Sequence, residues 1–168
     1  MKCTLFSLLI AILTIAACKP KDNIPPEPEE YFNCEINGKY WTYRSQPHSW
    51  TGNRGIGAGP SGLTSYVVHG RDMIGPPQTQ IIMYISGGNS FPDKDTFELG
   101  ASNRAEINHP YPIDSGQVGF STNDTYTGRL IFTQRKTDWI KGTFYFDVFD
   151  PAKNQVIHIT NGKFSIKL

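Results

Sequence analysis

The sequence has almost no net charge. Its 168 residues carry 16 basic and 15 acidic side chains, so the formal net charge is +1. Loss of a leader that contains Lys2 and no acidic residue would balance the two signs. Binding to the phosphate backbone of nucleic acid needs a basic face, and this composition supplies none. We therefore expect no nucleic-acid partner.

A long hydrophobic run is also missing. The apolar stretch Leu5 to Ala17 is shorter than the about 20 residues that a membrane-spanning helix needs. Lys2 precedes this stretch, and small residues end it just before Cys18. A positive start, an apolar middle and a small-residue end are the parts of a cleavable signal peptide. We predict that residues 1–17 form one, and that cleavage occurs before Cys18.

Ile15-Ala16-Ala17-Cys18 resembles the lipobox of bacterial lipoproteins. In that motif the cysteine thiol takes a diacylglyceryl group, and the freed amino group is usually acylated too. Two or three acyl chains such as palmitate anchor a protein firmly, whereas one chain is marginal. The resemblance implies a membrane partner through lipid on Cys18, and a place in the cell envelope as an outer-membrane lipoprotein.

Residues 18–30 are predicted to be the lipidated cysteine and a flexible tether. The segment Lys19 to Glu30 is rich in proline and glutamate, which favours extended, solvated chain. At about 3.1 Å per residue it would span roughly 35–40 Å. Lys19 and Asp22 partly match signals that send some Bacteroidota lipoproteins to the outer cell surface. Surface display is therefore a hypothesis, which protease shaving of intact cells would test.

Cysteine is scarce, with three in the whole chain. Cys3 lies in the predicted signal peptide and Cys18 is the predicted lipid site, which leaves Cys34 alone in residues 31–168. That part of the chain cannot form an internal disulfide, although exported domains often use them. Its stability must come from a hydrophobic core, and we expect Cys34 to be a small buried member of that core.

Residues 31–168 show no convincing helical periodicity, because their apolar residues recur at every second position instead. We predict strands at 31–36, 40–43, 63–69, 80–86, 96–99, 118–121, 128–134, 141–149, 156–159 and 164–168, and tight turns at Asn37-Gly38 and Asn161-Gly162. Residues 101–107 could hold one helical turn. The pattern predicts a single all-β antiparallel domain, and it leaves a sandwich and a barrel open.

Two stretches of this domain are similar to a family of small Bacteroidota envelope lipoproteins of unknown function. One runs from Phe32 to Trp41 (FNCEINGKYW) and matches an aromatic-x-Cys-x-(Ile/Val)-Asn-Gly-Lys hairpin. The other combines Gly142-Thr-Phe-Tyr-Phe with the Thr160-Asn-Gly-Lys-Phe hairpin. The match covers both ends of the domain and leaves out roughly residues 45–116. The resemblance implies an all-β domain behind a lipid anchor, and it implies no activity.

Residues 57–62 (GAGPSG) match the dinucleotide-binding fingerprint letter for letter. That chemistry needs the glycines at a strand-to-helix turn, where backbone N–H groups approach a pyrophosphate. The residues that follow, 63–68, are β-branched and aromatic and predict a strand, and Asp72 comes too early to be the ribose-binding acid. We therefore expect no cofactor here, and interpret residues 52–62 as a flexible Gly-rich surface loop.

Residue types that carry catalysis or bind metals form no recognisable pattern. No metal-ligand spacing joins the four histidines, which are His48, His69, His109 and His158. His158 is expected to be exposed. The acids at 93–95 and 123–124 suit turn chemistry better than calcium binding. Cys34 alternates with core residues, which argues against a nucleophile. We expect no metal site and no catalytic residue.

Aromatic residues cluster beside the first hairpin, and two interpretations stay open. If exposed, Trp41, Tyr43 and Trp50 are candidate ligand contacts, since stacking on sugar rings is a common device of β-sandwich modules. Alternatively, Trp41 is a core residue opposite Ile36 across the hairpin.

These observations favour a non-catalytic binding or interaction module that is tethered to a membrane and recognises a glycan, a peptide or another envelope protein. The first alternative is a structural component of an envelope assembly, which would bind nothing small. The second is a hydrolase, because an all-β fold by itself never excludes an enzyme.

Overall fold

The computed structural model describes residues 30–44, 54–74, 78–87, 92–110 and 117–168. The strands in these segments are β1 (Tyr31–Ile36), β2 (Lys39–Thr42), β3 (Ile56–Ser61), β4 (Ser65–Arg71), β5 (Gln80–Ser86), β6 (Thr96–Leu99), β7 (Arg104–Pro110), β8 (Gln117–Ser121), β9 (Gly128–Lys136), β10 (Trp139–Asp150) and β11 (Gln155–Lys167). The described segments contain no helix, so the prediction of an all-β fold is confirmed.

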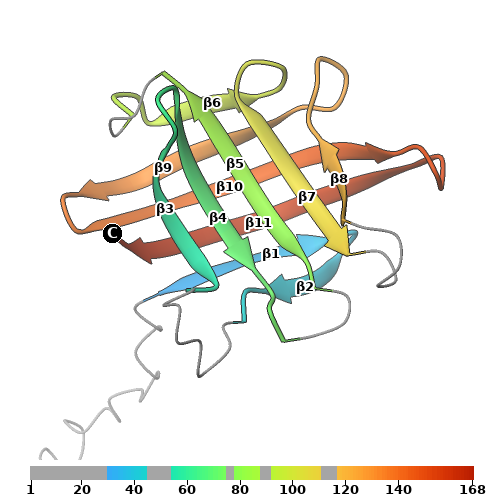
Figure 1. Ribbon diagram of the computed structural model, residues 1–168, viewed down its shortest axis with the longest axis horizontal. Coiled ribbons are helices and arrows are strands. Elements are labelled where there is room, and N and C mark those ends of the chain that lie inside the picture. Colours follow the sequence, from blue (N-terminus) through green and yellow to red (C-terminus); the bar gives the residue numbers. More distant parts are fainter. Residues whose placement is uncertain (1–29, 45–53, 75–77, 88–91, 111–116) are drawn as a thin grey trace, which may run out of the picture.

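The strands form two antiparallel sheets that pack face to face (Figure 1). The six-stranded sheet has the order β2-β1-β11-β10-β9-β6, and the five-stranded sheet has the order β3-β4-β5-β7-β8. In Figure 1 the five-stranded sheet lies in front, and its strands cross those of the other sheet obliquely. The described residues therefore form a β-sandwich, which decides the choice that the sequence left open.

The core lies between the sheets and is dominated by phenylalanine. Strand β10 shows the period of two directly, since its residues alternate between buried and outward-facing along most of its length. Phe32, Phe144 and Phe164 are buried and come from β1, β10 and β11. The ring centres of Phe32 and Phe144 are 4.9 Å apart. Cys34 is 2% exposed, which confirms its predicted place in the core.

The two Asn-Gly pairs adopt different structures. Asn37-Gly38 forms the predicted turn between β1 and β2, with φ angles of 50° and 75°. The turn predicted at Asn161-Gly162 is wrong, because β11 continues through both residues. Asn161 has a φ of 53° there, at a β-bulge where the register of β10 against β11 shifts. The bulge needs the same positive φ as a turn, and the long partner strand keeps the chain extended.

One segment that was expected to be able to hold a helical turn is mostly strand. Residues 101–107 hold no helical turn, because β7 covers most of them and pairs with β5 and β8. Ala105 and Ile107 face the core, and Arg104 and Glu106 face outward. This alternation of two apolar and two charged residues fits a half-buried strand.

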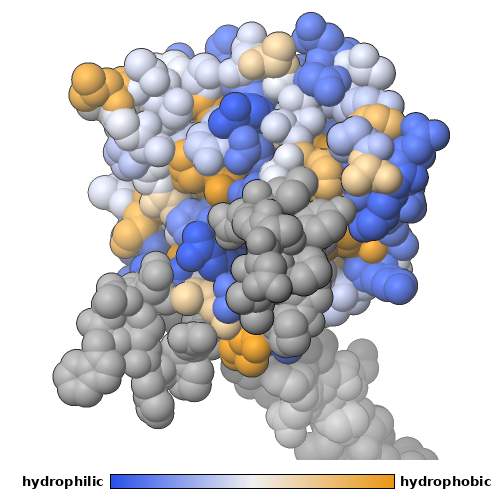
Figure 2. Space-filling view, turned by 45° about the vertical axis from the view of Figure 1, so that its right-hand side comes forward, coloured by the Kyte–Doolittle hydropathy of each residue, from blue (hydrophilic) through white to orange (hydrophobic). Residues whose placement is uncertain are grey.

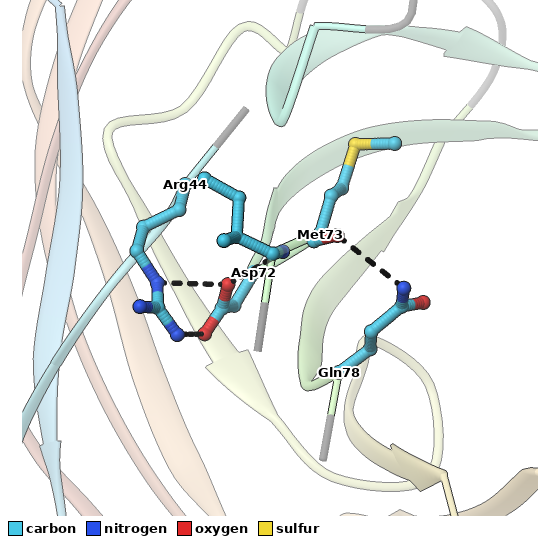
Figure 3. Close-up of polar contacts among 5 residues, drawn as sticks. Arg44, Asp72, Met73 and Gln78 are labelled. Carbon is cyan, nitrogen blue, oxygen red and sulfur yellow. Dashed lines mark hydrogen bonds and ion pairs between the residues drawn. The ribbon is translucent and has the colours of Figure 1, made fainter. Parts of the chain in front are cut away.

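A polar clamp joins the two sheets at the ends of β2 and β4 (Figure 3). The guanidinium of Arg44 donates to both carboxylate oxygens of Asp72, and the Nε–Oδ1 distance is 2.9 Å. The backbone N–H of Ile74 donates to the same carboxylate at 3.1 Å. Met73 donates its N–H to the carbonyl of Arg44, and its own carbonyl accepts from Gln78. Asp72 is only 6% exposed, and the hydrogen bonds from Arg44 and from the N–H of Ile74 compensate its buried charge.

Candidate functional site

The aromatic residues predicted as ligand contacts pack partly against the core. Trp41 meets Phe32 edge-to-face, with ring centres 6.1 Å apart. It pairs with Cys34 and not with Ile36, so the predicted register was wrong by two residues. Tyr43 also packs against the core. Trp50 lies outside the described residues. The assignment of these residues to a ligand stays a prediction.

The Gly-rich segment is an edge strand and not the predicted surface loop. Residues 56–61 form β3, which turns at Gly62 (φ 68°) into β4. The fingerprint therefore lies in an antiparallel strand-turn-strand, and the helix that a pyrophosphate site requires is replaced by β4, as the sequence predicted for residues 63–68. Because the strand period is two, Gly57 and Gly59 both lie on the outer face of the sheet, whereas Ile56 and Ala58 face the core.

The outer face of the five-stranded sheet is hollowed above these two glycines. The hollow has a volume of about 420 Å³. We call it the β3–β5 groove and define it by the residues that face it from the three strands, namely Gly57, Gly59, Val67, His69, Ile82 and Tyr84. The strand register explains their proximity. Gly57 pairs with His69 and His69 with Ile82, while Gly59 pairs with Val67 and Val67 with Tyr84.

The groove exists because β3 lacks side chains where β4 and β5 carry large ones. A Cβ atom at position 57 would lie 2.8 Å from Cε1 of His69, so the imidazole leans over Gly57 and occupies that space. A Cβ atom at position 59 would meet nothing within 4 Å, so the space above Gly59 is open. Ser61 lines one end of the groove and Gln80 lines the other.

His69 is uncharged at neutral pH. Burial, together with the nearby positive charge of Arg71, lowers its pKa below the ordinary value of 6.5. The neutral imidazole offers the groove one ring N–H donor and one ring nitrogen acceptor.

The far wall of the groove is held in place by charged neighbours. Tyr84 lies beneath the guanidinium of Arg104, whose Cζ is 5.0 Å from the ring centre. Arg104 also pairs with Glu106 at 2.9 Å. Arg104 over the ring favours this orientation of Tyr84. Glu106 balances the charge of Arg104, so the Arg104–Glu106 pair is formally neutral.

We expect His69 to make the stability of the fold fall at acid pH. Its pKa is lower in the folded protein than in the unfolded chain, so the unfolded chain binds more protons once the pH drops below about 6.5. The free energy of unfolding begins to fall at that pH, and this contribution stops falling once the pH lies below the pKa of His69 in the folded protein. Glutamine does not titrate, so the Tm of His69→Gln should fall less than the Tm of the wild type when the pH is lowered from about 7.5 to about 5. Thermal unfolding of both proteins checks this, and equal losses would contradict it.

Other reactive groups in the described residues are buried or engaged on the surface. Burial raises the pKa of Cys34 to about 12, so its thiol is neither ionised nor accessible. His158 is exposed as predicted, and its Nδ1 lies 2.9 Å from a carboxylate oxygen of Asp147. Asn123 accepts hydrogen bonds from the N–H groups of Thr125 and Tyr126, which confirms turn chemistry there. Nowhere in the described segments do three His, Cys, Asp or Glu side chains gather as metal ligands.

Comparisons of this chain with protein-family models, with curated proteins and with solved structures found no match. The similarity to envelope lipoproteins that its hairpin motifs suggest therefore stays a prediction. Among the residues that the structure describes, no helix is long and apolar enough to cross a membrane.

The sequence reading missed the groove. Val67, Ile82 and Tyr84 come from strands that were predicted, but each lies in an apolar run beside core residues, so the sequence does not mark their side chains as a separate outward-facing group. The available signal was the alternation of Gly57 and Gly59, which places two missing side chains on one face if the segment is a strand.

Proposed function

We propose that this chain is an envelope lipoprotein, anchored through lipid on Cys18, whose β-sandwich is a non-catalytic binding module. The observation that carries the binding role is the β3–β5 groove. Its volume of about 420 Å³ falls within the range of about 300–1,000 Å³ typical of small-molecule sites. Hydrogen-bonding groups at His69, Gln80 and Ser61 surround an apolar floor at Val67 and Ile82, which is the usual composition of such sites.

The chemistry of the described residues favours binding over catalysis. A hydrolase needs an activated nucleophile or a pair of acids and bases with matched pKa values. Cys34, with its raised pKa, is unsuited to the first role. His69 is the one histidine of the groove, and no carboxylate lines the groove beside it.

The surface of the domain also favours a module over a fixed part of an assembly. A permanent interface buries a continuous apolar patch. The large exposed hydrophobic residues of the described segments are scattered over different elements and include Tyr40, Leu63, Ile74 and Tyr145. On the face drawn in Figure 2, hydrophobic residues form patches that polar residues separate. The surface is therefore closer to that of a monomeric, ligand-binding domain.

A thermal-shift screen tests the binding role. The chain from Lys19 to Leu168 contains every strand of the sandwich and lacks the predicted signal peptide and lipid site. A ligand at a hundred times its Kd adds about 2.7 kcal/mol to the free energy of unfolding. For a domain of this size that raises Tm by several degrees. Oligosaccharides, peptides and peptidoglycan fragments are the probes, and the module is refuted if none of these classes raises Tm.

A further inference from the structure

We infer that the β3–β5 groove is a saccharide site, which takes one or two uncharged sugar units of a glycan with their ring faces against Val67 and Ile82. This inference rests on the proposed binding role and names its ligand class. It follows from the charge, the composition and the edge of the groove.

The charge of the groove matches an uncharged ligand. The residues that line it include no Asp, Glu, Lys or Arg. Its single titratable imidazole, His69, is neutral at pH 7. Outside the groove, Arg104 lies over the ring of Tyr84 in the far wall, and its charge is matched by Glu106 at 2.9 Å. Arg71, whose charge acts on His69, does not line the groove, so a phosphate or carboxylate bound there would contact no cation and would lose hydration without direct compensation.

The composition of the groove matches the two-sided chemistry of a sugar ring. A pyranose presents C–H groups on its faces and hydroxyl groups around its edge. Val67 and Ile82 supply an apolar floor for a face, and the ring of Tyr84 stands beside them. The amide of Gln80, the imidazole of His69 and the hydroxyl of Ser61 lie around that floor and can both donate and accept. A sugar hydroxyl can both donate and accept a hydrogen bond, so these three side chains are suitable partners for the hydroxyl groups at the edge of the ring.

The edge of β3 disfavours an extended peptide as the occupant. Arg71 donates its N–H to Gly55 at 2.6 Å, which fixes the hydrogen-bonding parity of the pair β3–β4. By that parity the backbone groups of Ile56, Ala58 and Pro60 point away from β4, toward the free edge. Pro60 has no N–H, so an added strand would lose a ladder hydrogen bond there. The groove is thus better suited to a ligand on the sheet face than to one added at the sheet edge.

The test fills the groove without disturbing the sheet. Gly59→Phe places a ring in open space, since a Cβ at this position meets nothing within 4 Å. The probes are neutral oligomers of glucose, mannose, xylose and N-acetylglucosamine, with oligogalacturonate and extended peptides as the charged and peptidic probes. Binding to the chain from Lys19 to Leu168 is measured by calorimetry. We expect a neutral oligomer to bind, and Gly59→Phe to weaken its binding at least about tenfold with Tm unchanged.

A matched control and a second variant make the result specific. Thr160→Phe adds the same ring to an exposed position of the other sheet and should leave the Kd unchanged. Gln80→Ala removes one hydrogen-bonding group and fills nothing, so it should weaken binding about fivefold even if Gly59→Phe were to lower Tm.

The remaining outcomes separate the two proposals. Binding of peptides or oligogalacturonate alone overturns the saccharide site and leaves the binding module standing. A neutral oligomer whose Kd is the same for Gly59→Phe and wild type also overturns it, because the sugar then binds elsewhere. The absence of binding by every class of probe overturns the saccharide site and the binding module together.

Discussion

Cys18→Ala is expected to move the protein from the membrane fraction to the soluble fraction and to abolish incorporation of labelled palmitate. The predicted lipid is attached to the thiol of this residue, so alanine leaves nothing to acylate at the side chain. Each buried CH₂ of an acyl chain contributes about 0.8 kcal/mol to membrane binding, and two or three chains make the anchor practically permanent. The loss should therefore be all-or-none. Fractionation of cells that express the full chain, followed by detection of the label, measures it.

The other two cysteines provide matched controls for this experiment. Cys3→Ala changes the predicted signal peptide and Cys34→Ala changes the core, and both variants should keep the label and the membrane association. Membrane retention of Cys18→Ala at the wild-type level would contradict the anchor, and label on Cys34 would contradict the burial of that thiol.

Strands could be predicted from the sequence where the local residue pattern agrees with the packing of the folded sandwich. Phe32, Cys34 and Ile36 alternate with polar neighbours, and β1 follows that alternation with its core residues inward. Asn37 and Gly38 tolerate positive φ, and the first hairpin turns on them. In these places the local preference and the packing agree, so local reasoning is sufficient.

The sequence failed where a partner strand decides between two local possibilities. Asn161-Gly162 has the same turn chemistry as Asn37-Gly38, but β10 extends far enough to pair with β11 on both sides of it. The pair therefore becomes a bulge, and no feature within the pair itself distinguishes the two cases. The edge strand β3 was missed for a related reason, because its glycines and Pro60 have low strand propensity and only the pairing with β4 makes them a strand.

The candidate site could not be predicted for a geometric reason. It joins residues of three strands, and His69 meets Gly57 only because the register of β3 against β4 sets them opposite each other. A shift of β3 by one residue against β4 would turn Gly57 toward the core and leave His69 on the outer face, held there by the pairing of β4 with β5. Sequence reasoning could identify aromatic and histidine candidates, but it could not bring Tyr84 to the same groove.

Phe164→Ala is expected to cost about 3–5 kcal/mol of folding free energy, which would lower Tm by roughly 6–20 °C at about 2–4 °C per kcal/mol. Phe164 is fully buried, and its ring centre lies 5.8 Å from that of Phe132 and 6.4 Å from that of Phe144. These rings come from three neighbouring strands of one sheet, so the substitution removes contacts from β9, β10 and β11 at once.

The structure also indicates that the cavity created by Phe164→Ala would persist. The residue paired with Phe164 on β10 is Gly142, and a Cβ there would overlap the Phe164 ring. Gly142 has no side chain that could move into the vacated space, so relaxation recovers little of the lost contact energy. Tyr145→Ala is the matched control, since it truncates an aromatic residue of β10 that is 49% exposed and should cost less than about 1 kcal/mol. Urea unfolding of the two variants measures both values. Similar losses of unfolding free energy in the two variants would mean that Phe164 does not belong to a tightly packed core. Because residues 31–168 contain one cysteine and no internal disulfide, the stability of the sandwich would then lack an explanation.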